Sequence, residues 1–264
     1  MIDNTTKSII EKIANDSGWN ICTQLDDDVC IFNNSYFLTA VHITLDEDNN
    51  FLISFSDKVK LLEIVNTAGT QQIALGDDAL VVGDTIIAKN KGALAKILYR
   101  ASELIYSEPS NPLREFEEEV EKEIIDLNAK GEILTTEREA TIKQRVGQDK
   151  YRMAQLKYWG NACAVTGCDV EVVLRASHAK PWSDCETDAE RLDVYNGFLL
   201  SADLDALFDK GFISFTFDGE IMVSPRIPNK QREILHLTSD LKLRWIQEEH
   251  YKYLDYHHKY VWKN

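Results

Sequence analysis

The sequence predicts an α+β protein with a small antiparallel β-rich domain at residues 1–90, a helical connector at 91–135 and a C-terminal domain at 136–264. Short runs of β-branched and aromatic residues, separated by Asp, Asn and Gly, fill most of the first part. Two helical patterns follow, and then strand-like runs flank a short helix. With 44% hydrophobic residues over 264 positions, the chain can bury two cores of modest size.

The first domain is expected to begin with an amphipathic helix and to continue as strands. In TTKSIIEKIANDSGW, apolar residues recur at helical spacing behind a threonine that suits the N-cap. The runs expected to form a mostly antiparallel sheet are VCIFNN, YFLTAVHITL, NFLISF, KVKLLEIV, QQIALG and ALVVGDTIIA.

Helices are expected to form the connector. The pattern GALAKILYRASELIY is apolar along one stripe from Gly92 to Tyr106 and stops near Pro109 and Pro112. The next helix, LREFEEEVEKEIIDLNAK, leads to Gly131. Its charge run EFEEEVEKE is typical of a solvated face, so we expect a connector or a dimer helix.

Residues suited to chemistry concentrate in the stretch ASHAKPWSDCETDAERLDVYNGFLLSADLDALFDKG. His178 ends VVLRASH, a strand-like run that would project the imidazole from a rigid edge. Asn196 opens an Asn-Gly turn, where an amide side chain can fix a neighbouring loop. In ADLDALFDKG, Asp203 suits the N-cap of a helix and Gly211 suits its stop.

Asp205 and Asp209 lie four residues apart on that helix, so both carboxylates share one face and can reach a single ion. Hydrolysis of a phosphodiester needs a base for water and a cation for the phosphate, and His178 with these carboxylates would supply both. Each residue also has a structural alternative: a capped surface helix, a histidine buried beneath Trp182, or a plain turn. The order His, Asn, Asp, Asp within one short stretch favours a metal-dependent nuclease site.

Three motifs, A-S-H-x-x-P-W, R-L-D-x-x-N-G and L-D-x-x-F-D-x-G, make this stretch resemble the HNH endonucleases, the ββα-metal nucleases. The resemblance implies that His178 is the general base and that Asn196 steadies the loop carrying the base. Asp205 falls where the family has its usual last histidine, and Asp209 where some members have a further metal-binding histidine. Many relatives carry Asp or His as a metal ligand immediately before the base, and Ser177 occupies that position here.

The resemblance extends over residues 85–264. A lead-in of the form R-x-G-Q-x-x-[FY]-R, followed by C-x-[VI]-T-G, is matched within TEREATIKQRVGQDKYRMAQLKYWGNACAVTG. The run GFISFTFDGEIMVS predicts a hairpin that turns at Asp218 and Gly219. A C-terminal H-x-x-Y-L-x-x-H runs from His250 to His257.

The ligand types favour a hard cation. Carboxylate oxygens suit Mg²⁺, with Mn²⁺ as a substitute. Many HNH proteins brace their fold with zinc held by two C-x-x-C pairs, but Ser201 and Leu204 stand where the second pair would be. Cys163 and Cys168 alone do not make a closed site, so we expect no structural zinc. Five cysteines without a signal peptide indicate reduced thiols and a cytoplasmic location.

The net charge of −15 is unusual for a protein that binds a polyanion. The excess lies mainly in residues 1–130, with 11 basic and 23 acidic residues, whereas residues 131–264 have 18 and 21. Between Arg138 and Trp182, eight basic residues accompany four acidic ones. We expect contacts to DNA phosphates from Arg145, Arg152, Arg175, Lys180 and Arg191.

Two of these cations have alternatives that the sequence leaves open. Arg191 either forks onto a phosphate or pairs with Asp188 or Asp193 and fastens the loop. Lys180 either contacts a phosphate or lies along the surface.

The sequence therefore predicts a hydrolase, a metal-dependent DNA endonuclease, and analogy suggests a role in restriction or defence. The alternative is a catalytically inactive nucleic-acid-binding or regulatory interaction protein on the same fold. DNA is the expected partner, and a homodimer would allow both strands to be cut. The domain at residues 1–90 would select the target or bind a protein or small-molecule regulator, and no apolar run approaches a membrane span.

Overall fold

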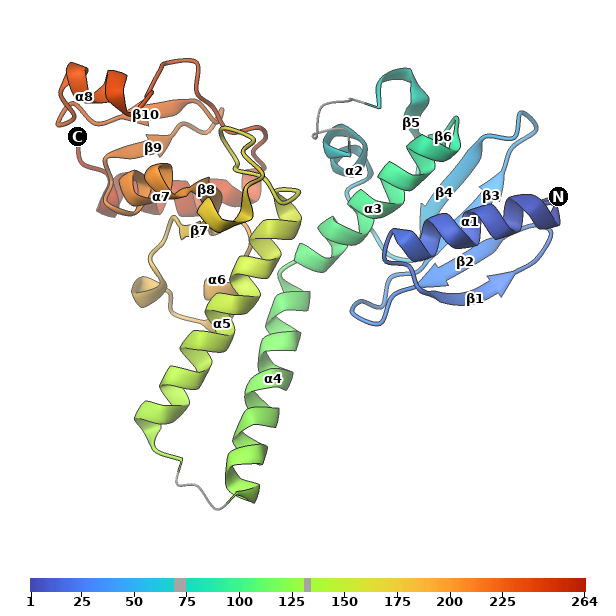
Figure 1. The fold of residues 1–264 in the computed structure, drawn as a ribbon, viewed down its shortest axis with the longest axis horizontal. Coiled ribbons are helices and arrows are strands. Elements are labelled where there is room, and N and C mark those ends of the chain that lie inside the picture. The colour runs from blue at the N-terminus through green and yellow to red at the C-terminus, as the bar shows by residue number, and fades with distance from the viewer. Residues whose placement is uncertain (69–74, 131–133) are drawn as a thin grey trace. The chain divides into compact units, whose positions relative to one another are not determined.

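The computed structural model describes residues 1–68, 75–130 and 134–264, which form two compact units. Unit 1 comprises Met1–Tyr106 and unit 2 comprises Ser107–Asn264. Unit 1 contains an antiparallel sheet and unit 2 combines helices with short strand pairs (Figure 1), which confirms the predicted α+β class. The expected connector at 91–135 is divided between them, since its first helix belongs to unit 1 and its second to unit 2. None of the described helices is long and apolar enough to cross a membrane.

Within the described residues, the sheet of unit 1 has the strand order β1-β2-β3-β4-β6-β5, and neighbouring strands are antiparallel throughout. Its strands are β1 (Ile21–Leu25), β2 (Cys30–Asn33), β3 (Val41–Leu45), β4 (Phe51–Phe55), β5 (Ala79–Val82) and β6 (Thr85–Ala88). Alternate residues of β3 and β4 are buried, and Ile43 lies directly opposite Ile53 in the register. This alternation is typical of a sheet with one covered face.

The helices of unit 1 are α1 (Asn4–Asp16), α2 (Leu61–Thr67), α3 (Lys91–Ser107) and the short 3₁₀ turn η1 (Gly76–Asp78). Trp19, just after α1, is fully buried, and its indole Nε1 donates to the carbonyl of Leu98 on α3 at 2.9 Å. The indole therefore fastens α1 to α3. The N-cap of α1 is Asp3, which accepts from the Thr6 amide at 2.9 Å, and the predicted threonine cap was wrong by a short shift along the chain.

The run KVKLLEIV forms mostly helix, so its prediction as a strand was wrong. Leu61–Thr67 is α2, in which the buried positions Ile64 and Thr67 are three residues apart, a helical spacing. The Thr67 hydroxyl donates to the carbonyl of Glu63 at 2.7 Å, a contact made within one helical turn. Most of the predicted strand QQIALG lies outside the described residues.

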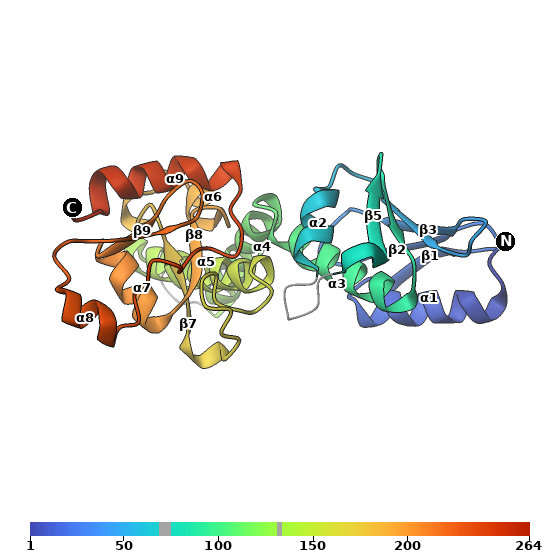
Figure 2. The ribbon, with the colours of Figure 1, turned by 90° about the horizontal axis from the view of Figure 1, so that it is seen from above.

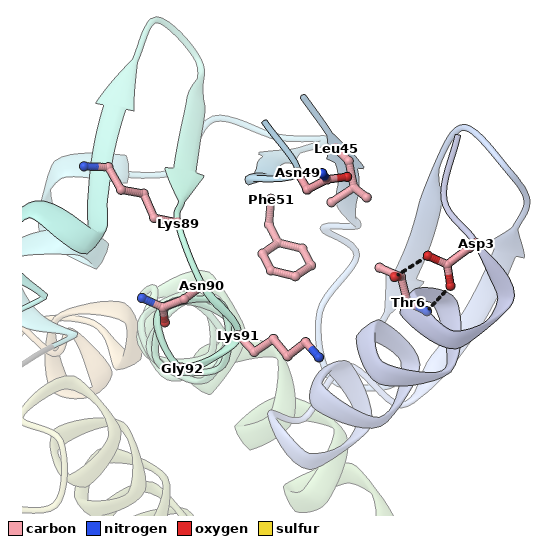
Figure 3. Close-up of a pocket in the computed structure, with 9 residues that line it drawn as sticks. All are labelled: Asp3, Thr6, Leu45, Asn49, Phe51, Lys89, Asn90, Lys91 and Gly92. Atoms are coloured by element: carbon pink, nitrogen blue, oxygen red, sulfur yellow. Dashed lines mark hydrogen bonds between the residues drawn. The ribbon is translucent and has the colours of Figure 1, made fainter. Parts of the chain in front are cut away.

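An open pocket of about 660 Å³ lies between the N-terminal ends of α1 and α3 and the β3–β4 turn (Figure 3). Phe51 and Leu45 supply apolar lining, and Lys89 and Lys91 supply charge. Both helix ends already carry side-chain caps, because Asn90 accepts from the Ala93 amide at 2.9 Å as Asp3 does for α1.

Unit 2 has four short strands and several helices within its described residues. The strands are β7 (Leu174–His178), β8 (Gly197–Ser201), β9 (Ile213–Phe215) and β10 (Ile221–Val223). The α-helices are α4 (Ser110–Ala129), α5 (Thr136–Tyr158), α6 (Asp188–Leu192), α7 (Ala202–Asp209), α8 (Asn229–Ile234) and α9 (Tyr251–Tyr256). The 3₁₀ turns are η2 (Glu171–Val173), η3 (Trp182–Asp184) and η4 (Glu248–His250), and η5 (His257–Val261) is a π-helical turn. The hairpin of β9 and β10 turns at Asp218 and Gly219 as predicted, with Gly219 at φ +84°.

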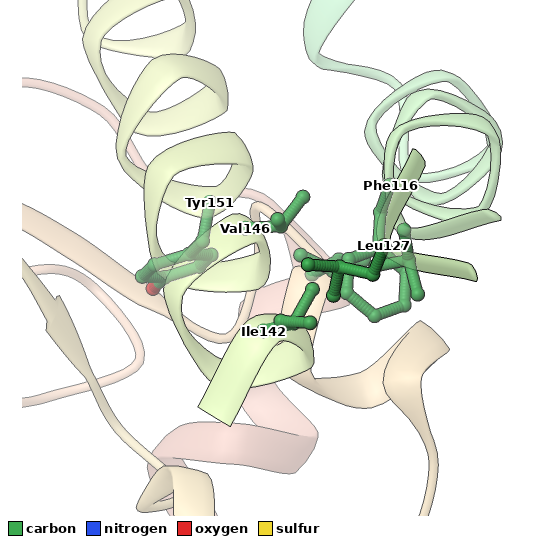
Figure 4. Packing of buried hydrophobic residues seen from close by; sticks show 7 residues of the cluster. Phe116, Leu127, Ile142, Val146 and Tyr151 are labelled. Atoms are coloured by element: carbon green, nitrogen blue, oxygen red, sulfur yellow. The ribbon is translucent and has the colours of Figure 1, made fainter. Parts of the chain in front are cut away.

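The long helices α4 and α5 pack side by side and share a buried apolar cluster (Figure 4). Phe116 comes from α4, Val146 and Tyr151 from α5, and Leu192 from α6. Ala176 of β7 packs against the same cluster. The helical pair is therefore joined through one core to the strand that ends at His178.

Removing the Phe116 ring should destabilise unit 2. We expect Phe116→Ala to lower the free energy of unfolding by about 3–5 kcal/mol, because the ring is 3% exposed and leaves a cavity. Urea unfolding followed by circular dichroism measures the change. Ile125→Ala is the matched control, since Ile125 lies on the same helix but is 57% exposed, and it should cost less than about 0.5 kcal/mol. Similar losses for both variants would contradict the assignment of the core.

Candidate functional site

The predicted site residues lie on a strand pair followed by a helix. β7 and β8 are antiparallel, and the register places His178 opposite Gly197. β8 runs directly into α7, which carries Asp205 and Asp209 (Figure 1). The helix begins two residues earlier than expected, with Ser201 at the N-cap position, so the prediction of Asp203 as the cap was wrong. Gly211 ends the helix as predicted, with φ +70° and its amide donating to the Phe208 carbonyl at 2.9 Å.

His178 is held on two sides and has one ring nitrogen committed. Its imidazole stacks on the Tyr151 ring, with 3.7 Å between centroids, and meets the edge of Trp182 at 5.8 Å. Nε2 lies 2.9 Å from the carbonyl oxygen of Arg191. Because a carbonyl only accepts, Nε2 carries the proton and the neutral ring keeps its lone pair on Nδ1. Burial lowers the pKa of His178 to about 4, so the ring is neutral at pH 7.

Asn196 is fully buried and ties together the loop between His178 and itself. Its Oδ1 accepts from the Lys180 amide at 2.8 Å. Its Nδ2 lies 3.2 Å from the carbonyl of Lys180, 3.1 Å from that of Glu190 and 3.3 Å from the Cys185 sulfur. With no exposed surface, the amide positions the loop and does not meet a substrate. These contacts agree with the steadying role that the resemblance implies.

Tyr151 contacts both His178 and the strand pair, and the sequence patterns did not single it out. Its hydroxyl lies 2.8 Å from the Asn196 carbonyl and 3.3 Å from the Ser177 carbonyl, and it accepts from Gln155 at 3.0 Å. Gly197 leaves room for this contact, because a Cβ there would lie 1.9 Å from the Ser177 oxygen. The signal was present in the R-x-G-Q-x-x-[FY]-R lead-in, whose aromatic position is Tyr151.

The same lead-in explains a second close contact. A Cβ on its glycine, Gly147, would lie 2.4 Å from the Trp182 ring, which in turn touches His178. Two glycines therefore allow α5 to approach the loop and the strand pair closely.

Ser177 on β7 and two carboxylates on α7, those of Asp205 and Asp209, provide oxygen atoms. The Ser177 residue is 3% exposed, and its hydroxyl has no hydrogen-bond partner of ordinary geometry in the described part of the chain. Burial raises the pKa of Asp205, the charge of Asp209 raises it further, and the neighbouring Ser177 hydroxyl and Arg175 lower it. A buried hydroxyl beside a carboxylate whose charge is disfavoured by burial and by Asp209 would suit a cation between them.

This donor set is small. Across residues 1–68, 75–130 and 134–264, no three or more His, Cys, Asp or Glu side chains converge as metal ligands do. Asp209 is exposed, and its carboxylate pairs with Lys210 at 2.6 Å. An ion held by Asp205, Asp209 and Ser177 would take its other ligands from water and phosphate, an arrangement typical of Mg²⁺.

Most of the basic residues expected to contact DNA are engaged within the protein. Arg191 pairs with Asp188 at 2.8 Å and donates to the carbonyls of Trp182 and Cys185, the loop-fastening alternative. Lys180 pairs with Glu190 at 2.8 Å.

Two arginines of the lead-in are likewise engaged. Arg145 pairs with Glu123 of α4, and Arg152 donates to the Leu174 carbonyl at 2.8 Å. Arg175 also donates to the carbonyls of Val172 and Leu174, at 3.0 and 2.9 Å. It is exposed at the start of β7, and its charge lowers the pKa of Asp205.

The cysteines expected to remain without zinc lie just ahead of β7. Cys163 is buried and accepts from the Thr166 amide at 3.5 Å, and its own amide donates to the Cys168 carbonyl at 2.8 Å. Cys168 is partly exposed.

The family model described as HNH endonuclease matches residues 163–216. This segment belongs to the HNH endonuclease family. The match begins at Cys163, covers β7, α6, β8 and α7, and ends just after β9. It confirms the family predicted from the motifs and makes the segment an HNH-type nuclease domain, a class that generally uses a divalent metal. No curated protein matches the chain.

Unit 2 should lose stability in mild acid because two of its histidines are buried and neutral. Burial lowers the pKa of His178 and of His257 to about 4, below the usual value near 6.5. As the pH falls through this window, the unfolded chain binds protons that the folded chain does not. The free energy of unfolding of the metal-free protein should therefore fall by about 1–2 kcal/mol per histidine between about pH 7 and about pH 5.

Urea unfolding at the two pH values measures this loss. His257→Gln keeps a polar side chain but does not titrate, so the variant should show a smaller drop than the wild type. Identical pH dependence in the two proteins would exclude His257 as a source.

Proposed function

We propose that unit 2 hydrolyses phosphodiester bonds of DNA with the help of a divalent metal ion, and that His178 is its general base. The observation that carries the proposal is the hydrogen bond from Nε2 to the Arg191 carbonyl, which leaves a basic lone pair on Nδ1. His178 on β7 and the carboxylates of α7 lie within the one segment that matches the HNH family model, which supports the proposal.

The proposed reaction uses few protein groups. Nδ1 of His178 takes a proton from a water molecule as the water oxygen bonds to phosphorus. The bond from phosphorus to the leaving oxygen breaks, and that oxygen takes a proton from solvent. The Tyr151 ring and the Arg191 carbonyl prevent the imidazole from turning away during the transfer.

Asp205, Asp209 and Ser177 would hold the metal. When bound, the ion would offset negative charge on the phosphate and the leaving oxygen. Oxygen donors and the small number of protein ligands favour Mg²⁺, with Mn²⁺ able to replace it. Arg175 is the basic residue that best suits a phosphate near this helix, because it is exposed and acts on Asp205.

The alternative function is a nucleic-acid-binding or regulatory protein that retains the fold without cleavage. Ser177 in a position where relatives carry a stronger ligand, and the small donor set, favour it. Metal-dependent cleavage decides between the two functions.

Fewer observations support the wider biological roles of the protein. A role in restriction or defence follows only from analogy with other HNH endonucleases. A homodimer and a regulator bound by unit 1 stay predictions, for which unit 1 offers the pocket beside Phe51 as a concave surface.

Plasmid DNA should be nicked or cut by the wild type with Mg²⁺ or Mn²⁺ and spared in excess chelator. His178→Ala should slow cleavage at least about a hundredfold, since a general base contributes that much or more. Gel electrophoresis measures the products, and circular dichroism checks folding. His42→Ala, at a partly exposed histidine of unit 1, is the control and should cut normally. A wild type that cuts neither DNA nor RNA with either metal would favour the non-cleaving alternative.

Loss of Asp205 should weaken metal binding more than loss of Asp209, because Asp205 is partly buried beside Ser177 and Asp209 is exposed. Calorimetric titration of Mn²⁺ into Asp205→Ala and Asp209→Ala measures the order, and cleavage at rising Mg²⁺ supports it. Asp203→Ala, at an exposed position on the same helix, controls for helix charge and should bind as the wild type does. Unchanged affinity in both site variants would place the ion elsewhere.

A further inference from the structure

The C-terminal segment carries basic and aromatic residues in an otherwise acidic chain. Residues 250–264 contain three lysines and one aspartate, a balance of +2, whereas the whole chain has −15. The segment also contains four tyrosines and a tryptophan. It forms α9 and the π-helical turn η5, and it includes the H-x-x-Y-L-x-x-H pattern, to which the proposed reaction gives no role.

Lysine and tyrosine side chains gather on one side of this helix. Lys252, Tyr256 and Tyr260 follow one another at intervals of four residues, so they share a face. Tyr260 is 62% exposed, and Lys252 and Lys259 are exposed as well. The buried side of α9 and η5 carries Tyr253, Leu254 and His257.

The half-buried Tyr256 ring and the exposed Tyr260 ring lie close to one another and to ammonium groups. The rings of Tyr256 and Tyr260 have centroids 4.6 Å apart. The Lys259 ammonium lies 5.0 Å from the centroid of Tyr260, and that of Lys180 lies 5.5 Å from Tyr256. We call Lys252, Tyr256, Lys259 and Tyr260 the C-terminal tyrosine face.

This face borders the loop that follows the proposed base. The Tyr256 hydroxyl donates to the Asp184 carboxylate at 3.0 Å, and Lys252 lies 3.3 Å from Asp193. Both aspartates belong to the loop between His178 and Asn196. Figure 2 shows α9 along an outer edge of unit 2. A nucleic-acid strand at His178 could therefore continue onto α9.

One lysine of this face differs from the basic residues of α5 and from Lys252. Lys150 pairs with Glu115 and Glu119, and Arg145 pairs with Glu123. Lys259, by contrast, makes no ion pair with any residue that the structure describes. Its exposed ammonium hydrogen-bonds to Tyr260, so a phosphate can meet the charge beside the flat apolar surface of that ring.

We propose that the C-terminal tyrosine face binds a single-stranded segment of DNA that leads to or from the cleavage site. Exposed aromatic rings stack on unpaired bases, and lysines beside them follow the phosphate backbone. Bases within a duplex offer only their edges, so the rings select unpaired DNA. The inference rests on the proposed function, from which it takes DNA as the substrate. It adds that the protein prefers DNA with an unpaired segment.

The test measures binding, so it does not depend on cleavage. Full-length His178→Ala protein in chelator is titrated with a blunt duplex and with the same duplex extended by a single-stranded overhang. A fluorescent adenine analogue in the overhang reports stacking. We expect tighter binding of the overhang substrate, and Tyr260→Ala added to this protein should raise its Kd about tenfold while leaving the blunt duplex unchanged.

Matched variants separate the ring from the charge. Tyr260→Phe keeps the ring and should retain both affinity and the fluorescence change. Lys259→Gln should weaken binding and reduce the salt dependence by about one phosphate contact. Lys230→Gln is its control, since Lys230 is exposed on α8 in the same unit, and it should bind as the parent protein does.

The outcomes distinguish this inference from the proposed function. Equal Kd values for Tyr260→Ala and its parent on the overhang substrate would overturn the tyrosine face, and so would no binding of either DNA. Metal-dependent cleavage by the wild type, measured in parallel, would leave the nuclease function standing in both cases.

Discussion

The contact of Tyr151 with the strand pair is the interaction on which the site depends. One face of its ring supports the His178 imidazole, and its hydroxyl lies between the carbonyls of Ser177 and Asn196. The same residue belongs to the core shared by α4, α5 and α6. The strength of that core therefore sets how firmly the base is held, because the ring cannot shift without disturbing apolar packing.

The sequence predicted the parts of the site that follow from short local patterns. It missed the contacts between residues that lie far apart in the chain. His178 at a strand end and Asp205 on a helix follow from short patterns, and both elements are present. Tyr151 lies 27 positions before His178 in the chain, so no local pattern connects them. The engagement of Arg191 depends on how its loop folds back onto Asp188, which the sequence left undecided.

The errors in the first domain have a common physical origin. KVKLLEIV is rich in β-branched and apolar residues, yet Leu61–Thr67 is helical, since burial of Ile64 and Thr67 against the unit decides the conformation over a weak local preference. The two predicted N-caps were also misplaced. Asp3 and Ser201 are the residues that directly precede the first helical turn, so they are the caps in place of the predicted threonine and Asp203. Propensity identifies an element more reliably than its ends.

The atom that fixes the tautomer of His178 belongs to the main chain. Every amino acid at position 191 would present the same carbonyl, so changes of that side chain cannot delete the acceptor. The arginine side chain can therefore diverge at the cost of loop stability alone, while the proton stays on Nε2. Evolution is free to vary the surface around the base without altering its protonation chemistry.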